Sequence, residues 1–187
     1  MTGSRTRILV EIALVVALAT VLDFIKVWQM PMGGTVSLGM LPILVIALRR
    51  GLAPGLVAGA LSGVVALLFN AQVYNWAQFL LDYPLAFAAV GGAGSLAVVW
   101  RWAVDRGTAA RDAAWIVPAA VMLGAGARLF MHWESGILFF AQYAPAGQPG
   151  WLYSLIYNGS YMLPSGILCA VAAAIVLPAL EKAVPVR

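Results

Sequence analysis

Charged side chains are scarce in this sequence. Asp, Glu, Lys and Arg make up 10% of the 187 residues, and the mean hydropathy is +0.94. Soluble domains carry about 25% charged residues, so the composition excludes an ordinary soluble protein. Apolar runs of about 20 residues recur along the chain, and a run of that length crosses a bilayer as a helix. The sequence therefore predicts an all-α integral membrane protein.

Residues that build catalytic and metal centres are also nearly absent. The chain has one cysteine, Cys169, and one histidine, His132, which excludes an internal disulfide and a zinc cluster. It has no glycine-rich phosphate loop and no HExxH or GxSxG pattern. We therefore expect no catalytic residue, no metal and no cofactor, and a transporter built from this chain alone would lack a means of hydrolysing ATP.

Six apolar segments are candidate membrane spans, and they form a single domain over residues 1–187. They cover residues 8–27, 38–49, 53–70, 78–100, 113–139 and 151–180. The second segment is short, so it either extends back through the glycine-rich residues before it or crosses as a partly irregular element packed against protein.

The basic residues between these spans predict the orientation. Segments on the N-terminal side of the membrane hold Arg5, Arg7, Arg49, Arg50, Arg101, Arg106, Arg111, Lys182 and Arg187, whereas the other side holds only Lys26. Since Lys and Arg concentrate in cytoplasmic loops, both termini are expected in the cytoplasm. Topology and anionic lipid explain the excess of positive charge, and we see no indication of nucleic-acid binding.

Small residues recur at helical spacing in two spans. Ala13 and Ala17 lie four apart in the first span, and Gly55, Gly59 and Gly63 form a similar stripe in the third. Small residues at this spacing let helices approach closely in lipid. The pattern alone suits internal packing as well as docking of a partner.

Polar side chains gather near the outer side of the predicted membrane. Asp82 and Tyr83 lie about one turn inside the fourth span, His132 lies roughly 25 to 30 Å along the fifth, and Tyr153 and Asn158 lie in the first two turns of the sixth. Polar groups at membrane depth are costly unless they face protein or water. Their convergence predicts a ligand pocket.

Helical spacing ranks the charged candidates. Arg128, His132 and Gly136 share one face of the fifth span, with Gly136 leaving room for a flat ring. Glu134 points about 200° from His132, toward a lipid headgroup or a lid. Asp82 is therefore the preferred acid, and its partner is Arg128 in a structural ion pair, a ligand cation or a proton.

Aromatic residues are abundant around these positions. They are Trp76, Tyr83, Trp133, Phe139, Phe140, Tyr143, Trp151, Tyr153 and Tyr157. One interpretation is an interface belt of the kind that Trp and Tyr form in most membrane proteins. The other is a binding site for a flat organic cation, since ring faces attract cations and a carboxylate completes the neutralisation.

Three segments together resemble a known family. Residues 33–51 read GGTVSLGMLPILVIALRRG, residues 78–87 read QFLLDYPLAF, and H-x-x-x-G followed by Y-x-x-x-x-N-G runs from His132 to Gly159. The chain resembles the thiamine-specific substrate-binding subunit, or S component, of energy-coupling factor transporters. The resemblance implies a six-helix bundle in a prokaryotic plasma membrane that captures thiamine from outside with high affinity. It also implies docking on a transmembrane coupling subunit and two ATPase subunits that use ATP.

The resemblance also implies roles for particular residues. By position, the thiamine contacts are Asp82, Tyr83, His132, Gly136, Tyr153 and Asn158. Phe140 stands where a stacking Trp is expected, Trp28 is nearest to an expected first-loop Trp, and Trp76 is a further candidate contact. Asp82 stands where some relatives have Glu. Ala13 and Ala17 match the small-residue surface that docks on the coupling subunit.

Three other functions stay open from the sequence. The first is an S component for another vitamin or a thiamine precursor, such as riboflavin. The second is an intramembrane enzyme that uses His132 with Asp82 or Glu134 as acid and base, although no nucleophile motif supports it. The third is a structural membrane subunit without a small ligand.

Overall fold

The computed structural model describes residues 2–31, 33–70 and 72–185, most of them helical. The helices are α1 (Thr2–Phe24), α2 (Leu41–Arg50), α3 (Leu52–Asn70), α4 (Trp76–Leu80), the π-helical η1 (Leu81–Leu85), α5 (Ala86–Val90), the 3₁₀-helical η2 (Gly91–Leu96), α6 (Ala97–Asp105), α7 (Ala109–Phe139), the 3₁₀-helical η3 (Ala141–Tyr143) and α8 (Gly150–Ala183). Between α1 and α2, the short strands β1 (Trp28–Gln29) and β2 (Thr35–Val36) form an antiparallel hairpin.

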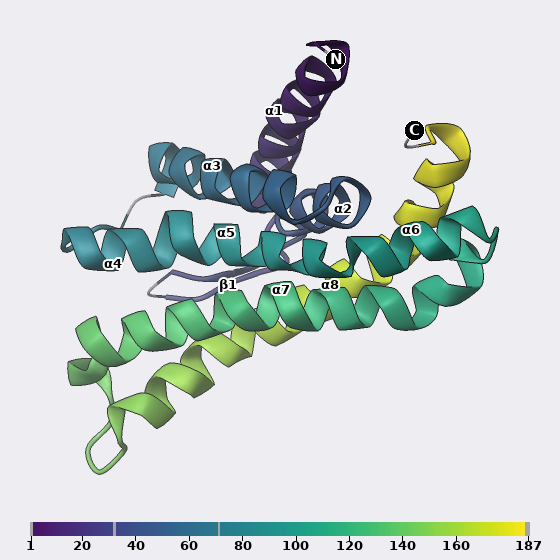
Figure 1. Cartoon of the computed structure of the whole chain (residues 1–187). Coiled ribbons are helices and arrows are strands. Elements are labelled where there is room, and N and C mark those ends of the chain that lie inside the picture. The colour runs from purple at the N-terminus through teal and green to yellow at the C-terminus, as the bar shows by residue number, and fades with distance from the viewer. Residues whose placement is uncertain (1, 32, 71, 186–187) are drawn as a thin grey trace.

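Segments α4 to α6 follow one another without a break, so within the described residues the chain forms six helical rods. Four of them are long and apolar enough to cross a membrane: α3, the α4–α6 rod, α7 and α8. In Figure 1 these four lie as successive layers, with α1 rising steeply from one side. The predicted all-helical membrane fold of six helices is thereby confirmed.

Helix α2 is the short second span, and it lies at the centre of the protein. Its Ile43, Leu44 and Ala47 are fully buried, and Trp100 of α6 is buried in the same cluster. The preceding glycine-rich residues form the hairpin and a turn rather than a helical extension. The helical extension is therefore not adopted, and the irregular backbone before α2 packs against protein, where it is tolerated.

The glycine stripe of α3 faces the α4–α6 rod. A Cβ placed on Gly59 would lie 2.1 Å from the carbonyl oxygen of Phe87, and one on Gly63 would lie 2.4 Å from that of Tyr83. A Cβ on Gly55 would lie 2.9 Å from the oxygen of Gly91. This stripe therefore serves internal packing, because only glycine lets the two backbones come so close.

A π-helical turn shapes the α4–α6 rod beside this contact. Pro84 lies inside η1, and a proline in a helix lacks the N–H that would continue the usual bonding. A π turn accommodates the missing bond without ending the helix, and such turns are frequent at functional sites. Asp82 and Tyr83 are both on this turn.

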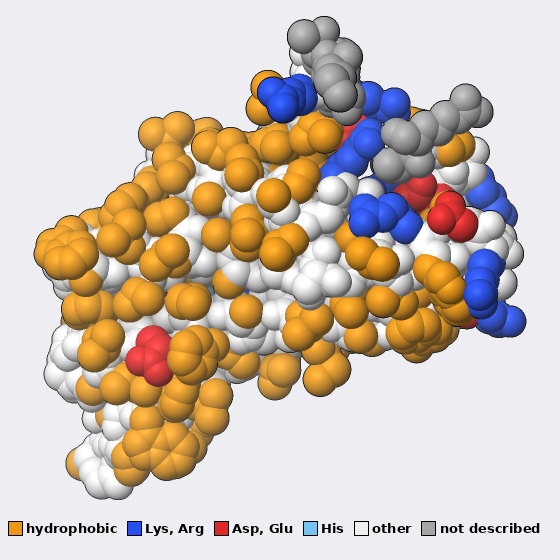
Figure 2. Space-filling view, in the orientation of Figure 1, with side chains coloured by type: hydrophobic (Ala, Val, Ile, Leu, Met, Phe, Trp, Pro, Cys, Tyr) orange, Lys and Arg blue, Asp and Glu red, His pale blue; other side chains and the backbone are white. Residues whose placement is uncertain are grey.

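Ion pairs tie the helices together near the two termini. Arg50 of α2 binds Glu11 of α1 through Nε at 2.6 Å, and Arg49 Nε binds Glu181 of α8 at 2.8 Å. The buried Trp100 donates its indole N–H to Glu181 at 3.3 Å. On the face shown in Figure 2, the Lys and Arg side chains gather at the end that holds both termini.

Replacing Gly59 with alanine is expected to destabilise the protein, because the new methyl group would overlap the Phe87 carbonyl. Overpacking of this kind costs about 1 to 3 kcal/mol. Gly126→Ala in α7 is the matched control, since nothing lies within 4 Å of its Cβ position. Thermal unfolding in detergent should show a lower midpoint for Gly59→Ala alone, and equal midpoints would contradict the packing role.

Candidate functional site

A cavity of about 200 Å³ opens between α1, the hairpin, α3, η1, α7 and α8. The residues around it come from the last turns of α1 and α3, the start of the α4–α6 rod, the C-terminal half of α7 and the first turns of α8. These helix ends lie on the side of the molecule away from the two termini (Figure 1). The cavity therefore lies toward the end opposite the basic cluster.

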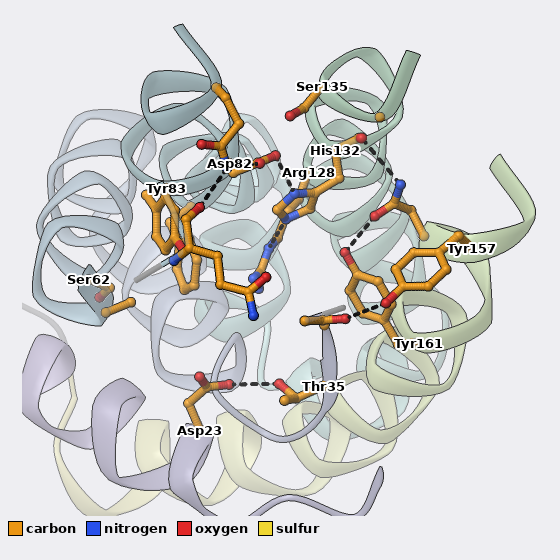
Figure 3. A pocket seen from close by; sticks show the side chains of 18 of the residues that line it. Asp23, Thr35, Ser62, Asp82, Tyr83, Arg128, His132, Ser135, Tyr157 and Tyr161 are labelled. Carbon is orange, nitrogen blue, oxygen red and sulfur yellow. Dashed lines mark hydrogen bonds and ion pairs between the residues drawn. The ribbon is translucent and has the colours of Figure 1, made fainter. Parts of the chain in front are cut away.

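Asp82 and His132 join two walls of this cavity. The Nδ1 atom of His132 lies 3.1 Å from Oδ1 of Asp82, and Oδ2 of Asp82 accepts a 2.7 Å hydrogen bond from Nε2 of Gln78. The two side chains are only 17% and 11% exposed. Because both carboxylate oxygens have partners, Asp82 is held rigidly on the π turn (Figure 3).

Arg128 completes a chain of polar contacts with His132. Its Nε donates to Nε2 of His132 at 3.3 Å, and its guanidinium carbon lies 3.9 Å from the centre of the Phe87 ring. An arginine nitrogen can only donate, so Nε2 of His132 must be the acceptor and Nδ1 must carry the proton. The geometry therefore describes a neutral imidazole that donates to Asp82 and accepts from Arg128.

Asn158 binds α8 to α7 beside the histidine. Its Nδ2 donates to the backbone oxygens of Ser154 at 2.9 Å and His132 at 3.2 Å, and its Oδ1 accepts from the Tyr161 hydroxyl at 2.7 Å. A Cβ on Gly136 would lie 2.0 Å from Oγ of Ser154. The space that Gly136 leaves is thus occupied by α8 and brings the two helices together.

The hairpin covers the cavity on the side of α8. The hydroxyl of Tyr157 donates to the Gly33 carbonyl at 3.0 Å, and the Tyr161 ring lies directly under Gly34. Gly34 has a φ of +87°, and a Cβ there would lie 2.5 Å from the Tyr161 ring. Both the backbone conformation and the close contact require glycine at this position.

Most of the residues singled out in the sequence come together here. The cavity is lined by Asp82, Tyr83, His132, Gly136, Phe140, Tyr153 and Asn158. Trp28 and Trp76 do not line it, and they are 63% and 75% exposed. Glu134 is also outside the lining. Ala13 and Ala17 are exposed on α1, away from the cavity.

Several lining residues were not selected from the sequence. Asp23 and Thr35 face the cavity from α1 and β2, and Gln78 and Tyr161 face it from α4 and α8. Asp23 lies within the predicted first span and Gln78 at the start of the fourth, so the cost of polar groups in lipid marks both. Tyr161 follows Tyr157 by four residues, which places both on one helical face.

Comparison with known proteins gives a consistent set of relatives. A family model described as "Thiamine transporter protein" matches residues 9–184. The chain is 42% identical over 166 residues to the thiamine transporter ThiT of Bacillus subtilis (strain 168), a match that covers 87% of this chain and 86% of that protein. It is 34% identical over 174 residues to ThiT of Lacticaseibacillus paracasei, covering 91% and 86%.

One solved structure matches over nearly the whole chain. It is that of ThiT from Listeria monocytogenes, with a TM-score of 0.85 and 30% sequence identity. The match covers 96% of this chain and 97% of the other. The fold is therefore shared from end to end.

The protonation of His132 offers a direct test of its hydrogen bonds to Asp82 and Arg128. Since the chain has one histidine, ¹⁵N-histidine labelling gives a single imidazole in the NMR spectrum. Without ligand near neutral pH, we expect a neutral ring with the proton on Nδ1. In Arg128→Gln the proton should stay on Nδ1, because the Asp82 carboxylate can only accept a hydrogen bond. A wild-type ring protonated on Nε2 alone would contradict these hydrogen bonds.

Proposed function

The chain belongs to the thiamine transporter family, and on that premise we propose that it is the thiamine-binding S component of an energy-coupling factor importer. The family consists of transport proteins, so the chain is a multi-pass membrane protein of a prokaryote and not an enzyme. Among the possibilities that the sequence left open, family membership favours thiamine over another vitamin and transport over acid–base catalysis.

The observation that carries this proposal is the paired polar and aromatic lining of the cavity. Thiamine joins an aminopyrimidine, which needs hydrogen-bond partners, to a thiazolium that carries a permanent positive charge. Asp82 on η1 and His132 on α7 present a fixed acceptor and a fixed imidazole face on two adjoining walls. A buried carboxylate is stabilised by a cation, and the ligand would add one.

Aromatic rings complete the proposed thiamine site. Phe140 and Tyr153 line the cavity, and Phe140 packs edge-on against Tyr74 with ring centres 5.6 Å apart. Ring faces attract the thiazolium, so Phe140 can take the place of the expected tryptophan. Trp28 and Trp76 are not among the proposed thiamine contacts, because neither lines the cavity.

Asn158 takes an indirect part in this proposal. Its amide bonds to α7, α8 and Tyr161. It therefore holds the backbone of His132 in position against α8. Gly136 likewise acts by letting Ser154 approach. Both residues therefore shape the site by holding α7 against α8, and neither is proposed to bond to the ligand.

We further propose that the cavity opens to the outside of the cell. The basic side chains gather at the end with the termini (Figure 2), and the positive-inside rule assigns that end to the cytoplasm. The cavity lies at the other end. Thiamine would then enter from outside and leave only after the protein changes its position or conformation.

The energy for that change would come from partner subunits that hydrolyse ATP. Ala13 and Ala17 are exposed on the same side of α1, where their small side chains would let a helix of the transmembrane coupling subunit approach closely. Two ATPase subunits would act through that coupling subunit. The chain itself would hold no cofactor.

Titration of the purified protein tests the proposed ligand. Thiamine should bind in calorimetry, whereas riboflavin and biotin should not. Asp82→Asn should weaken thiamine binding by about tenfold or more, because a charged hydrogen-bonding group is lost. Glu134→Gln is the matched control and should bind normally. Saturable riboflavin binding without thiamine binding would assign another vitamin.

Enlarging the small residues of α1 tests the proposed docking surface. The double variant Ala13→Leu/Ala17→Leu should bind thiamine like the wild type in isolation, since both residues lie away from the cavity. It should lose most thiamine uptake in cells that also make the partner subunits, because the helices can no longer approach. Normal uptake by this variant would remove α1 from the docking surface.

A further inference from the structure

Helix α1 packs on the bundle through a small hydrophobic cluster of its own. Ile12 is buried against Ile46 of α2 and Ala58 of α3, and this cluster is separate from the main core, which Ala19 of α1 joins. In Figure 1 the N-terminal half of α1 rises away from the four long helices. The position of this half therefore depends on the contacts that one face of α1 makes.

An ion pair with α2 lies in the same half of α1. Nε of Arg50 donates to Oε2 of Glu11 at 2.6 Å, and Nη2 of Arg50 donates to Oε1. Two parallel bonds of this kind fix the direction of approach as well as the distance. The Arg50 and Glu11 side chains are 9% and 25% exposed, so salt and water screen this pair less than an exposed one.

Arg50 is itself held in a fixed position. It is the last residue of α2, and Gly51, with a φ of +102°, turns the chain directly into α3 at Leu52. Its neighbour Arg49 bonds Glu181 of α8. The end of the buried helix α2 is thus a rigid point from which one arginine reaches α1 and the next reaches α8.

Glu11 and the proposed docking residues lie on different faces of α1. Residues two apart in a helix point about 200° from each other, so Glu11 faces α2 while Ala13 is exposed, as is Ala17. A partner helix packed on Ala13 and Ala17 would not touch Glu11. The ion pair can therefore affect docking only through the position of α1.

We propose that the ion pair between Glu11 and Arg50 positions α1 for docking on the coupling subunit. This inference rests on the proposed function, since it takes the exposed face of α1 as the docking surface. Packing on small residues requires close approach, and a gap of about 0.5 to 1 Å already forfeits a quarter to a half of the attraction between atoms. The pair is needed for docking but not for thiamine binding, because neither residue lines the cavity.

The test measures docking and thiamine binding separately in Glu11→Gln, Arg50→Gln and the double variant. Biolayer interferometry in detergent gives the affinity of the full-length chain for the assembled coupling and ATPase subunits. We expect each single variant to weaken docking by about fivefold or more, and the double variant to lose no more than either, since all three break the same pair. Calorimetry should show unchanged thiamine affinity.

Two neighbouring arginines provide matched controls. Arg49→Gln breaks the 2.8 Å bond to Glu181 at the same end of α2, so it should lower the thermal unfolding midpoint and leave docking unchanged. Arg7→Gln removes the exposed second partner of Glu11, which lies 3.2 Å away. It should change neither quantity, because exposed pairs of this kind contribute little.

The position of α1 can also be measured without any partner subunit. Spin labels on cysteines that replace Val10 of α1 and Val98 of α6, both exposed, report the distance between the two helices, and Cys169 is fully buried and should stay unlabelled. Pulsed electron resonance should give one narrow distance distribution for the otherwise wild-type chain. Adding Glu11→Gln should shift or broaden it, whereas adding Arg7→Gln should not.

The outcomes separate this inference from the proposed function. Normal docking in Glu11→Gln, additive losses in the double variant, an unchanged distance distribution, or an equal docking loss in Arg49→Gln would each overturn the inference. Thiamine binding and docking by the wild type would still leave the proposed function standing in all of these cases. A wild-type chain that binds neither thiamine nor the partner subunits would overturn both.

Discussion

Polar groups inside a membrane protein must find partners within the protein, and the architecture of this chain depends on that constraint. The contacts from Gln78 through Asp82 and His132 to Arg128 link four polar side chains across two helical rods. Each member is costly alone at membrane depth. Together they fix the distance between η1 and α7, and the cavity is the space that this distance leaves open.

Close backbone contacts make these polar bonds possible. Gly59 and Gly63 bring α3 against the α4–α6 rod, and Gly136 brings α8 against α7. The π turn around Pro84 then offsets Asp82 from a regular helical position. A bulkier side chain at any of these glycines would move a wall of the cavity, so the packing of the fold and the geometry of the site are inseparable.

Two carboxylates, Asp82 and Asp23, line the cavity, whereas only Asp82 was selected from the sequence. The sequence indicated Asp82 and left open whether Arg128 was its direct partner. In the structure His132 lies between them, so the pairing is indirect. Asp23 stayed outside the predicted set although it is a charged residue in the predicted first span, because only the packing of α1 against the other helices places it at the cavity.

The sequence by itself determined the membrane location, the six helices, the polar face of the fifth span and the resemblance that pointed to a thiamine transporter. These features follow from composition, apolar run length and helical periodicity, which act over neighbouring residues. Only the tertiary structure decided that Trp28 and Trp76 lie outside the cavity, that Asn158 is engaged with α7, and that Asp23 lines the cavity. Such outcomes depend on how closely distant helices approach, and that distance is set by packing between segments rather than by any one of them.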